Sequence, residues 1–202
     1  MTLDPLSVAL AATAYVAGAV PSGYLIAKKM KGIDIREHGS GNPGAANVYR
    51  IAGTTAGLWT LGIDAFKGFL PVLAARHMRP DDLELALLCG ALAIVGHVWT
   101  VFLVFKGGKG VATSAGVFSA LLPGPMVPTL LVFIFGVARS GHISVGSMCA
   151  AAALPIFAAL FRPPLPLMLL ACAASALVLL RHIPNLLSLL RGERLAARKA
   201  VR

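Results

Sequence analysis

LELALLCGALAIVGHVWTVFLVFKGGKGVATS, residues 83–114, decides what kind of fold this chain can adopt. From Leu83 to Phe105 the segment is almost wholly apolar. At about 1.5 Å per residue, a helix of this length crosses the roughly 30 Å hydrocarbon core of a bilayer. Two lysines and three glycines follow in residues 106–110, and a new apolar run begins near Val111. This order is typical of a membrane helix that ends at a basic loop on one side of the membrane.

Apolar runs of this kind recur along the whole chain. Of its 202 residues, 57% are hydrophobic and only 13% are charged, and the mean hydropathy is +0.81. The charged share is about half of that in a soluble domain. Only helices and closed barrels satisfy backbone polar groups in lipid, and these runs are too long and too uniform for the alternating strands of a barrel. The sequence therefore predicts an all-α, polytopic membrane protein, with one membrane-integral domain over residues 1–202 and no soluble domain.

We expect about seven transmembrane helices. Their approximate limits are Leu3–Ala27, Ile51–Ala75, Leu83–Phe105, Val111–Leu122, Met126–Ala138, Ile143–Leu160 and Leu165–Leu180. The fourth and fifth are short for a bilayer, and the helix-breaking segment Pro123-Gly124-Pro125 separates them. This pair either spans a thinned membrane or dips in and returns. Both alternatives put Arg139 on the same side as Lys109.

The basic residues orient these helices. With seven spans, one side of the membrane holds only Arg76, Arg79 and Arg162, and Lys67 lies within a span. The other side holds Lys28, Lys29, Lys31, Arg36, Arg50, Lys106, Lys109, Arg139, Arg181, Arg191, Arg194, Arg198, Lys199 and Arg202. The positive-inside rule places this basic side in the cytoplasm, with the N-terminus outside and the C-terminus inside. The net charge of +10 is then mainly a topology signal, with some attraction to anionic lipid, and does not indicate nucleic-acid binding.

Polar residues gather in four clusters on the predicted cytoplasmic side, and in a membrane protein such clusters locate function. In the glycine-lysine loop, Val104–Gly110, the glycines expose backbone N–H groups, and Lys106 and Lys109 add positive charge. Together with the N-terminus of the next helix, this arrangement attracts an anion such as phosphate. The spacing is not that of a Walker A nucleotide site. A glycine turn with two anchoring lysines is the alternative interpretation.

A second cluster, EHGSGNPGAANVYR at residues 37–50, combines three glycines with Ser40, Asn42 and Arg50. Hydroxyl, amide and guanidinium groups together would hold a phosphate well. The alternative is a capped cytoplasmic loop with a snorkelling arginine.

The third and fourth clusters are residues 139–147 and 180–193. In the third, Ser144 and Ser147 are three residues apart and can share a helix face, and the same holds for His182 and Asn185 in the fourth. Small packing serines between membrane helices and an interfacial histidine are the alternatives.

Two charged residues, Asp64 and Lys67, lie inside the second predicted helix at a spacing of three. They can neutralise each other within the bilayer, and a structural ion pair is favoured over direct chemistry. His97 precedes the glycine-lysine loop within two turns. We interpret it as a residue that packs helices or braces this loop.

Taken together, these clusters resemble one family, the bacterial acyl-phosphate-dependent glycerol-3-phosphate acyltransferases. The resemblance runs from Pro21 to Glu193 and is carried by GSGNPGAANVYR at residues 39–50, DAFKG at 64–68 and FKGGKGVAT at 105–113. It implies seven spans with an outside N-terminus, as the charge pattern also predicts.

Three positions depart from the family's pattern. Ala46 stands where members often have Thr, and Thr100 stands near the place of a frequent Pro. The last motif, usually His-Arg-x-Asn, reads HIPN at residues 182–185. Pro184 restrains the residue before it, and Arg181 offers a replacement for the missing charge.

The resemblance implies a role for each matched residue. The residues expected to bind the phosphate of glycerol 3-phosphate or of acyl phosphate are Ser40, Asn42, Arg50 and Lys109, with the backbone N–H groups of Gly107, Gly108 and Gly110. The residues expected around the reacting groups, as catalytic residues, are Ser147, His182 and Asn185. No metal, no cofactor and no acyl-CoA are implied.

The implied reaction transfers an acyl group from acyl phosphate to the 1-hydroxyl of glycerol 3-phosphate, and gives lysophosphatidic acid and phosphate at the cytoplasmic face of the bacterial inner membrane. An acyl phosphate already has a good leaving group, so the site needs donors that bind two phosphates and orient the alcohol rather than a protein nucleophile. We therefore expect direct attack without an acyl-enzyme. A general-base role for His182 and a covalent role for Ser147 are the alternatives. Because the reaction consumes acyl phosphate, we also expect a functional link to an enzyme that produces it.

Two other functions fit parts of the sequence. A transporter or flippase for an anionic, phosphorylated solute would use Gly- and Pro-broken helices and an intramembrane ion pair. Against it, the polar clusters lie on one side and no internal repeat is evident. His77 and Asp82 match the His-x4-Asp spacing of acyl-CoA-type acyltransferases, but the predicted topology puts both outside, away from the glycine-rich clusters.

Overall fold

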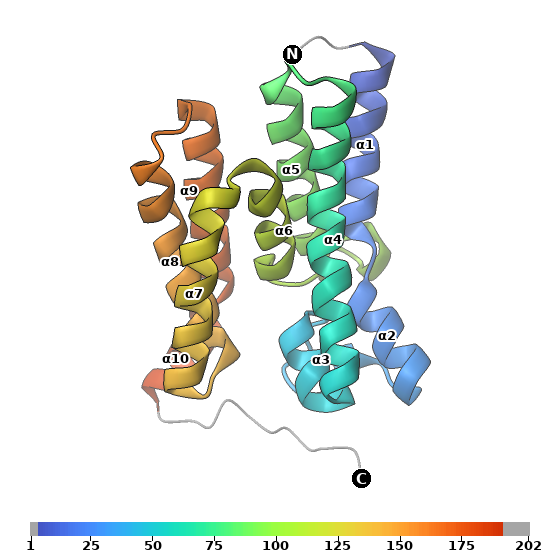
Figure 1. Cartoon of the computed structure of the whole chain (residues 1–202). Helices are drawn as coiled ribbons and strands as arrows, with labels where there is room; N and C mark the ends of the chain where they lie inside the picture. The colour runs from blue at the N-terminus through green and yellow to red at the C-terminus, as the bar shows by residue number, and fades with distance from the viewer. Residues whose placement is uncertain (1–3, 192–202) are drawn as a thin grey trace.

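The computed structural model describes residues 4–191, and in that part of the chain every regular element is a helix (Figure 1). The α-helices are α1 (Pro5–Ala19), α2 (Ser22–Lys31), α3 (Ala45–Ala52), α4 (Thr54–Met78), α5 (Leu83–Val98), α6 (Val111–Leu121), α7 (Pro123–Ser140), α8 (Ile143–Leu160), α9 (Leu165–Arg181) and α10 (Ile183–Leu190). Two short 3-10 helices, η1 (Ile35–Glu37) and η2 (Val101–Leu103), lie in the connections. The prediction of an all-α fold is confirmed.

Five segments of the described chain are long and apolar enough to cross a membrane. They are Pro5–Lys31, Thr54–Met78, Leu83–Leu103, Pro123–Ser140 and Ile143–Leu160. A sixth results if α9 and α10, which are bent by 47° relative to each other, form one span. Helix α6 has 11 residues and reaches about half of the hydrocarbon core. The predicted count of seven is therefore reached only with this half-length helix included, and the orientation of the chain stays a prediction.

Two of the expected helices are interrupted. The expected helix Leu3–Ala27 ends at Ala19 and restarts at Ser22, because Pro21 has no N–H to donate to the ladder. The expected helix Leu83–Phe105 ends at Val98, and the chain leaves it through η2. It then reverses through two residues in the left-handed region, Val104 at φ 52° and Phe105 at φ 60°. Side chains of this size rarely adopt that conformation.

The expectation of a short fifth helix, Met126–Ala138, is wrong. Pro123 and Pro125 lie in the first turn of α7, where the helix needs no N–H from them, so the Pro-Gly-Pro segment begins an 18-residue helix. The other limits agree within a few residues, except that the expected helix Ile51–Ala75 becomes α3 and α4 on either side of Gly53.

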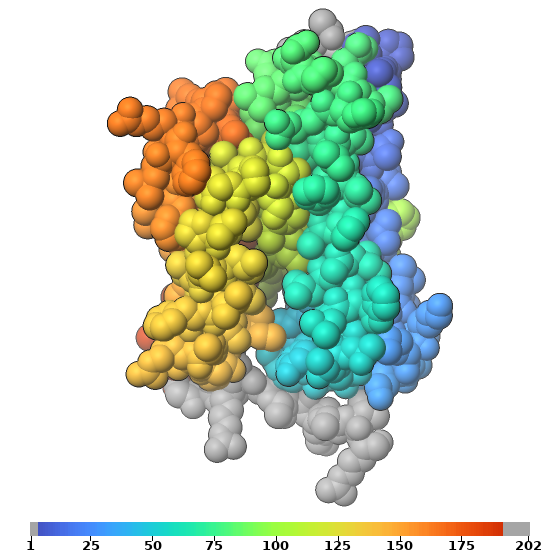
Figure 2. All heavy atoms as spheres, in the orientation of Figure 1, coloured from blue at the N-terminus to red at the C-terminus, as the bar shows by residue number. Residues whose placement is uncertain are grey.

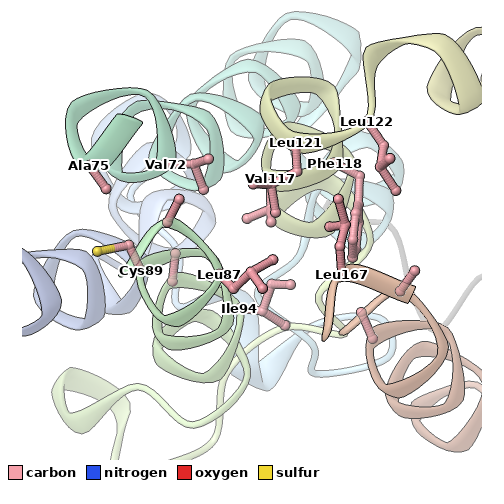
Figure 3. Packing of buried hydrophobic residues seen from close by; sticks show 14 of the residues in the cluster. Val72, Ala75, Leu87, Cys89, Ile94, Val117, Phe118, Leu121, Leu122 and Leu167 are labelled. Atoms are coloured by element: carbon pink, nitrogen blue, oxygen red, sulfur yellow. The ribbon is translucent and has the colours of Figure 1, made fainter. Parts of the chain in front are cut away.

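The buried core lies where α4, α5, α6 and α9 meet (Figure 3). Phe118 of α6 is fully buried there, in the same cluster as Val72 of α4 and Leu167 of α9. On the outer faces, in contrast, Trp59 and Phe66 of α4 are more than half exposed. Lipid is as apolar as these side chains, so the helices are held together by close packing rather than by removal of apolar surface from water.

Glycines permit the closest of these approaches, between α4 and α6. A Cβ atom at Gly116 would lie 1.9 Å from the carbonyl oxygen of Ala65, and one at Gly68 would lie 2.2 Å from that of Thr113. The two backbones therefore touch on both sides of the contact. This contact fixes the start of α6, and with it the end of the glycine-lysine loop.

Gly116→Ala is expected to destabilise the protein, because the new Cβ forces α4 and α6 apart. Overpacking of this kind costs about 1–3 kcal/mol. Gly62→Ala is the matched control on α4, since a Cβ there meets nothing within 4 Å. Thermal unfolding in detergent micelles should show a lower midpoint for G116A and an unchanged or slightly higher midpoint for G62A. Equal midpoints for the two variants would contradict this account of the contact.

Candidate active site

A cavity of about 110 Å³ brings the polar clusters of the sequence together. Its walls come from the loop before α3, from α3, α4, α6, α7 and α8, and from the junction of α9 and α10. Figure 2 shows the corresponding hollow between α7 and the α3–α4 region on one face of the molecule. Arg50 is exposed, whereas Ser147 and His182 are only 4% and 3% exposed. The cavity therefore runs from an open, cationic rim to a dry interior.

Most of the residues singled out in the sequence line this one cavity. They are Ser40, Asn42, Arg50, Lys109, Gly110, Ser147, His182 and Asn185. Gly107 and Gly108 do not line it; they border a small adjoining cavity, which shares Asp64 and His97 with the first. Ser144, which the third polar cluster contains, is also in its wall. The sequence alone did not single out Asn47 or Phe133, which line it as well.

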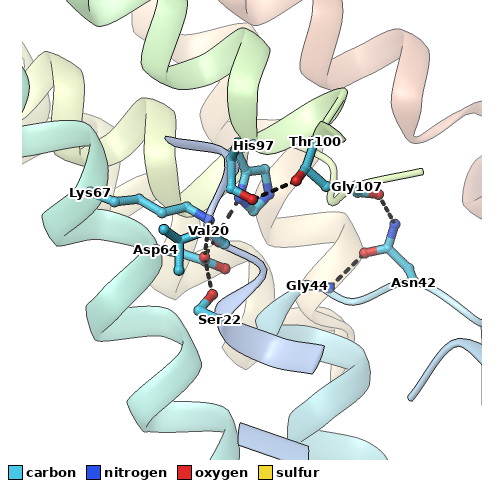
Figure 4. Close-up of polar contacts among 10 residues, drawn as sticks. Val20, Ser22, Asn42, Gly44, Asp64, Lys67, His97, Thr100 and Gly107 are labelled. Carbon is cyan, nitrogen blue, oxygen red and sulfur yellow. Dashed lines mark hydrogen bonds and ion pairs between the residues drawn. The ribbon is translucent and has the colours of Figure 1, made fainter. Parts of the chain in front are cut away.

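The loop before α3 is shaped by Asn47. This side chain is 3% exposed, accepts the N–H of Ser40 at 3.0 Å and donates to the carbonyl of His38 at 3.0 Å. Asn42 accepts the N–H of Gly44 at 2.9 Å and donates to the carbonyl of Gly107 at 3.4 Å (Figure 4). The amide of Asn42 thus joins this loop to the glycine-lysine loop.

The glycine-lysine loop is held by hydrogen bonds of its own backbone. The N–H of Gly107 donates to the carbonyl of Val98 at 3.1 Å, and that of Gly108 donates to the carbonyl of His97 at 3.1 Å. The expectation that these two amides bind phosphate is therefore corrected: they fasten the loop to the end of α5. Gly110, at φ 86°, caps α6 and lines the cavity, so it keeps its expected position.

Lys109 extends from this loop into the cavity, where its Nζ donates to the side-chain oxygen of Asn185. Burial lowers the pKa of Lys109 to about 8, and the positive charges of Arg181 and Arg50 act in the same direction. An anion placed among these cations would raise this pKa again, because it favours the charged amine. The site is thus electrostatically prepared for a phosphate group.

His182 has a defined tautomer. Its Nδ1 lies 2.8 Å from the carbonyl oxygen of Val178, which can only accept, so Nδ1 carries a hydrogen. In the neutral ring, Nε2 is then left with a lone pair. Ser147 donates its hydroxyl hydrogen to the carbonyl of Ile143 at 2.8 Å, and its oxygen remains able to accept.

A second cavity, of about 150 Å³ and almost wholly apolar, adjoins the first. It lies between α6, α7, α8 and α9, with Met126 and Leu154 in its wall. The two cavities share the residues Leu61, Val111, Ala112, Phe133 and Ser147. A molecule with an anionic end and an apolar chain can therefore occupy both at once.

The predicted ion pair is confirmed, and the acyl-CoA-type motif is not part of this cavity. Lys67 Nζ lies 2.8 Å from Asp64 Oδ1, and both side chains are buried (Figure 4). Asp82 accepts the N–H of Leu85 at 2.9 Å as the N-cap of α5. His77 is exposed at the same end of the bundle, remote from α3 and the site (Figure 1).

The fold and the site define an integral membrane protein with a cationic cavity that continues into an apolar one. Comparison with known sequences defines it further. The sequence model of the family described as glycerol-3-phosphate acyltransferase matches residues 8–192, so this chain belongs to that family.

Individual relatives match over nearly their whole length. The chain is 46% identical to the glycerol-3-phosphate acyltransferase of Geobacter sulfurreducens over 184 residues, which cover 91% of this chain and 93% of the relative. It is 44% identical to that of Geotalea daltonii over 179 residues, 89% and 91% of the two chains.

A solved structure also agrees with the fold. The crystal structure of PlsY, an integral membrane glycerol 3-phosphate acyltransferase, in its glycerol 3-phosphate form has a TM-score of 0.88 and 34% sequence identity, and the match covers 93% of this chain and 94% of that one. The lysophosphatidic acid form of PlsY has a TM-score of 0.86 at the same identity, with 93% of each chain covered.

Proposed function

We propose that this protein transfers an acyl group from acyl phosphate to the 1-hydroxyl of glycerol 3-phosphate, with lysophosphatidic acid and phosphate as products. The observation that carries the proposal is the pair of joined cavities, one cationic and one apolar, with Ser147 in their common wall. The family supports the acceptor, since relatives bear the name of this activity and PlsY has been solved with glycerol 3-phosphate and with lysophosphatidic acid.

The two substrates divide the site between them. Arg50, Lys109 and Ser40 are the donors for the phosphate of glycerol 3-phosphate near the open rim. The acyl chain of the donor lies in the apolar cavity, and the phosphate of the donor lies where the apolar and the cationic cavities meet. Acyl phosphate fits this arrangement because its polar part is a single phosphate, which the junction of the two cavities can hold.

The chemistry is a direct displacement. The 1-hydroxyl oxygen attacks the acyl carbon, the bond between that carbon and the phosphate oxygen breaks, and the leaving phosphate takes the hydroxyl proton. Holding the two reactants about 3–3.5 Å apart supplies much of the rate. His182, whose Nε2 can accept a hydrogen bond, orients the 1-hydroxyl of the acceptor. Asn185, whose side-chain oxygen is taken by Lys109, can donate from its amide nitrogen to the charge that develops on the carbonyl oxygen. No covalent acyl-enzyme is required, because phosphate already leaves well.

The membrane setting of the proposed reaction follows from the charge pattern. The basic loops support a position of the open rim at the cytoplasmic face of a bacterial inner membrane. There the site meets a water-soluble acceptor and an amphiphilic donor from the bilayer, and an enzyme that produces acyl phosphate is its expected functional partner.

The test is an assay with purified protein in detergent. It should convert glycerol 3-phosphate to lysophosphatidic acid with acyl phosphate as donor, and not with acyl-CoA. Product formed with acyl-CoA but not with acyl phosphate would refute acyl phosphate as the donor. Absence of product in detergent, together with solute uptake in sealed vesicles, would favour the transporter instead.

Arg50→Ala should strongly lower kcat/KM for glycerol 3-phosphate, because it removes a charged hydrogen-bond donor to the phosphate of that substrate. The loss of such a bond costs about 1.5–3 kcal/mol, which is roughly tenfold to more than a hundredfold in kcat/KM. His77→Ala is the control, since His77 is exposed and remote from the cavity. A wild-type kcat/KM in R50A would exclude Arg50 from the site.

The affinity for glycerol 3-phosphate should fall as the pH rises through about 8, the pKa of Lys109. The sign follows from the amine, which is charged below its pKa and neutral above it, while the phosphate monoester, with a second pKa of about 6, stays a dianion. Lys109→Arg keeps its charge over this range, so it should flatten the dependence whatever its absolute affinity. Parallel pH profiles of KM in the two proteins between pH 7 and 9.5 would contradict the assignment.

Ser147→Ala should retain measurable turnover, because Ser147 touches the substrates without forming a bond to them. Wild-type protein incubated with labelled acyl phosphate, in the absence of glycerol 3-phosphate, should carry no acyl label. A labelled protein whose label is lost in S147A would establish the covalent route in its place.

A further inference from the structure

His97 lies where the α1–α2 break, α4 and the glycine-lysine loop meet (Figure 4). It is 7% exposed, and its Nδ1 is 3.5 Å from Asp64 Oδ1. The other edge of the ring faces Gly108, where a Cβ atom would fall 2.0 Å from Nε2 and 2.7 Å from Cε1. No side chain fits at Gly108 while the imidazole occupies this place.

The position of the His97 ring is fixed by Asp64, which faces its Nδ1 edge. Asp64 is 1% exposed and accepts hydrogen bonds from Lys67 and from the hydroxyl of Ser22. Lys67 also donates to the carbonyl of Val20 at 2.8 Å. The carboxylate that faces His97 is thus tied to α4 and to both sides of the α1–α2 break.

The backbone of His97 also holds Gly108, beside the contact that its ring makes with this glycine. The carbonyl of His97 accepts the N–H of Gly108 at 3.1 Å, and Lys109 follows directly. From the opposite side, Arg181 donates to the carbonyl of Gly108 at 3.3 Å. Gly108 is therefore clamped between the end of α5 and the end of α9, and this clamp carries the amine of Lys109 into the cavity.

We propose that His97 is a positioning residue for Lys109, and that Asp64, held by Lys67 and Ser22, keeps the imidazole in place. The side chain of His97 sets the position of Gly108, and Gly108 sets that of Lys109. The inference rests on the proposed function only in taking glycerol 3-phosphate as the anion. Binding is therefore measured without any acyl donor.

The first test compares three proteins by the dissociation constant for glycerol 3-phosphate in detergent. His97→Ala removes the contact with Asp64 and with Gly108, and should weaken binding about tenfold or more, since small misplacements in a site have effects of this size. His97→Asn keeps an N–H donor at the place of Nδ1 and should stay within about threefold of the wild type. His77→Ala is the matched histidine control. Wild-type affinity in H97A would overturn the proposal.

The second test is a double-mutant cycle, which remains decisive if H97A does not fold. Gly108→Ala alone should weaken binding about tenfold, because its Cβ collides with the imidazole. In H97N the atoms at Nε2 and Cε1 are absent, so H97N/G108A should bind within about threefold of H97N. Non-additivity of this kind is expected of residues in contact. An equal penalty for G108A in both backgrounds would overturn the proposal.

The outcomes also distinguish a positioning role of His97 from a general-base role, and from failure of the proposed function. If the wild-type protein does not bind glycerol 3-phosphate, the proposed function fails. If it binds and the cycle is additive, only the positioning role fails. If H97N binds normally but loses about 10² to 10⁴ in kcat, His97 is a general base and the positioning role is refuted.

Discussion

The rest of this structure depends on a buried carboxylate. Asp64 is almost completely removed from solvent, and an unpaired charge in such a place costs far more than a single contact can return. Its partners are Lys67 one turn away, Ser22 of α2 and His97 of α5. The carboxylate is satisfied only when α2, α4 and α5 are all in place. In lipid, apolar packing alone distinguishes poorly between arrangements, so a polar constraint of this kind helps to specify one of them.

The same reasoning applies to backbone groups that helices leave unpaired. The carbonyls of Ala19 and Val20, at the break after α1, accept from Thr100 and Lys67. The carbonyls of Gly107 and Gly108 accept from Arg181. Irregular backbone inside a membrane protein persists only where other parts of the chain satisfy it. Some polar side chains that the sequence suggests as ligand-binding groups therefore hold irregular backbone segments instead. These segments in turn position Lys109 and Ser40 in the cavity.

Sequence patterns predicted the helices and the residues of the cavity well, because apolar length and isolated polar clusters are strong signals in a membrane protein. The break at Pro21 was open to prediction from its missing N–H, as was the start of α7 at Pro123. The left-handed conformations of Val104 and Phe105 were not, since their intrinsic preferences oppose it. Nor does spacing reveal that the N–H groups of Gly107 and Gly108 are already used. That depends on contacts with α5, which form only in the folded chain.

The proposed reaction needs a reason why water does not take the acyl group first, since acyl phosphate is reactive and the cavity opens at its rim. The arrangement of the cations supplies one. Arg50 and Lys109 come from separate segments and line the same cavity, and in the proposed reaction both bind the phosphate of the acceptor. Binding energy gained there places the hydroxyl against the acyl carbon, whereas water has no phosphate with which to gain it. Selectivity then arises from a part of the substrate that does not react, and the dry interior around His182 and Ser147 leaves few positions from which water could compete.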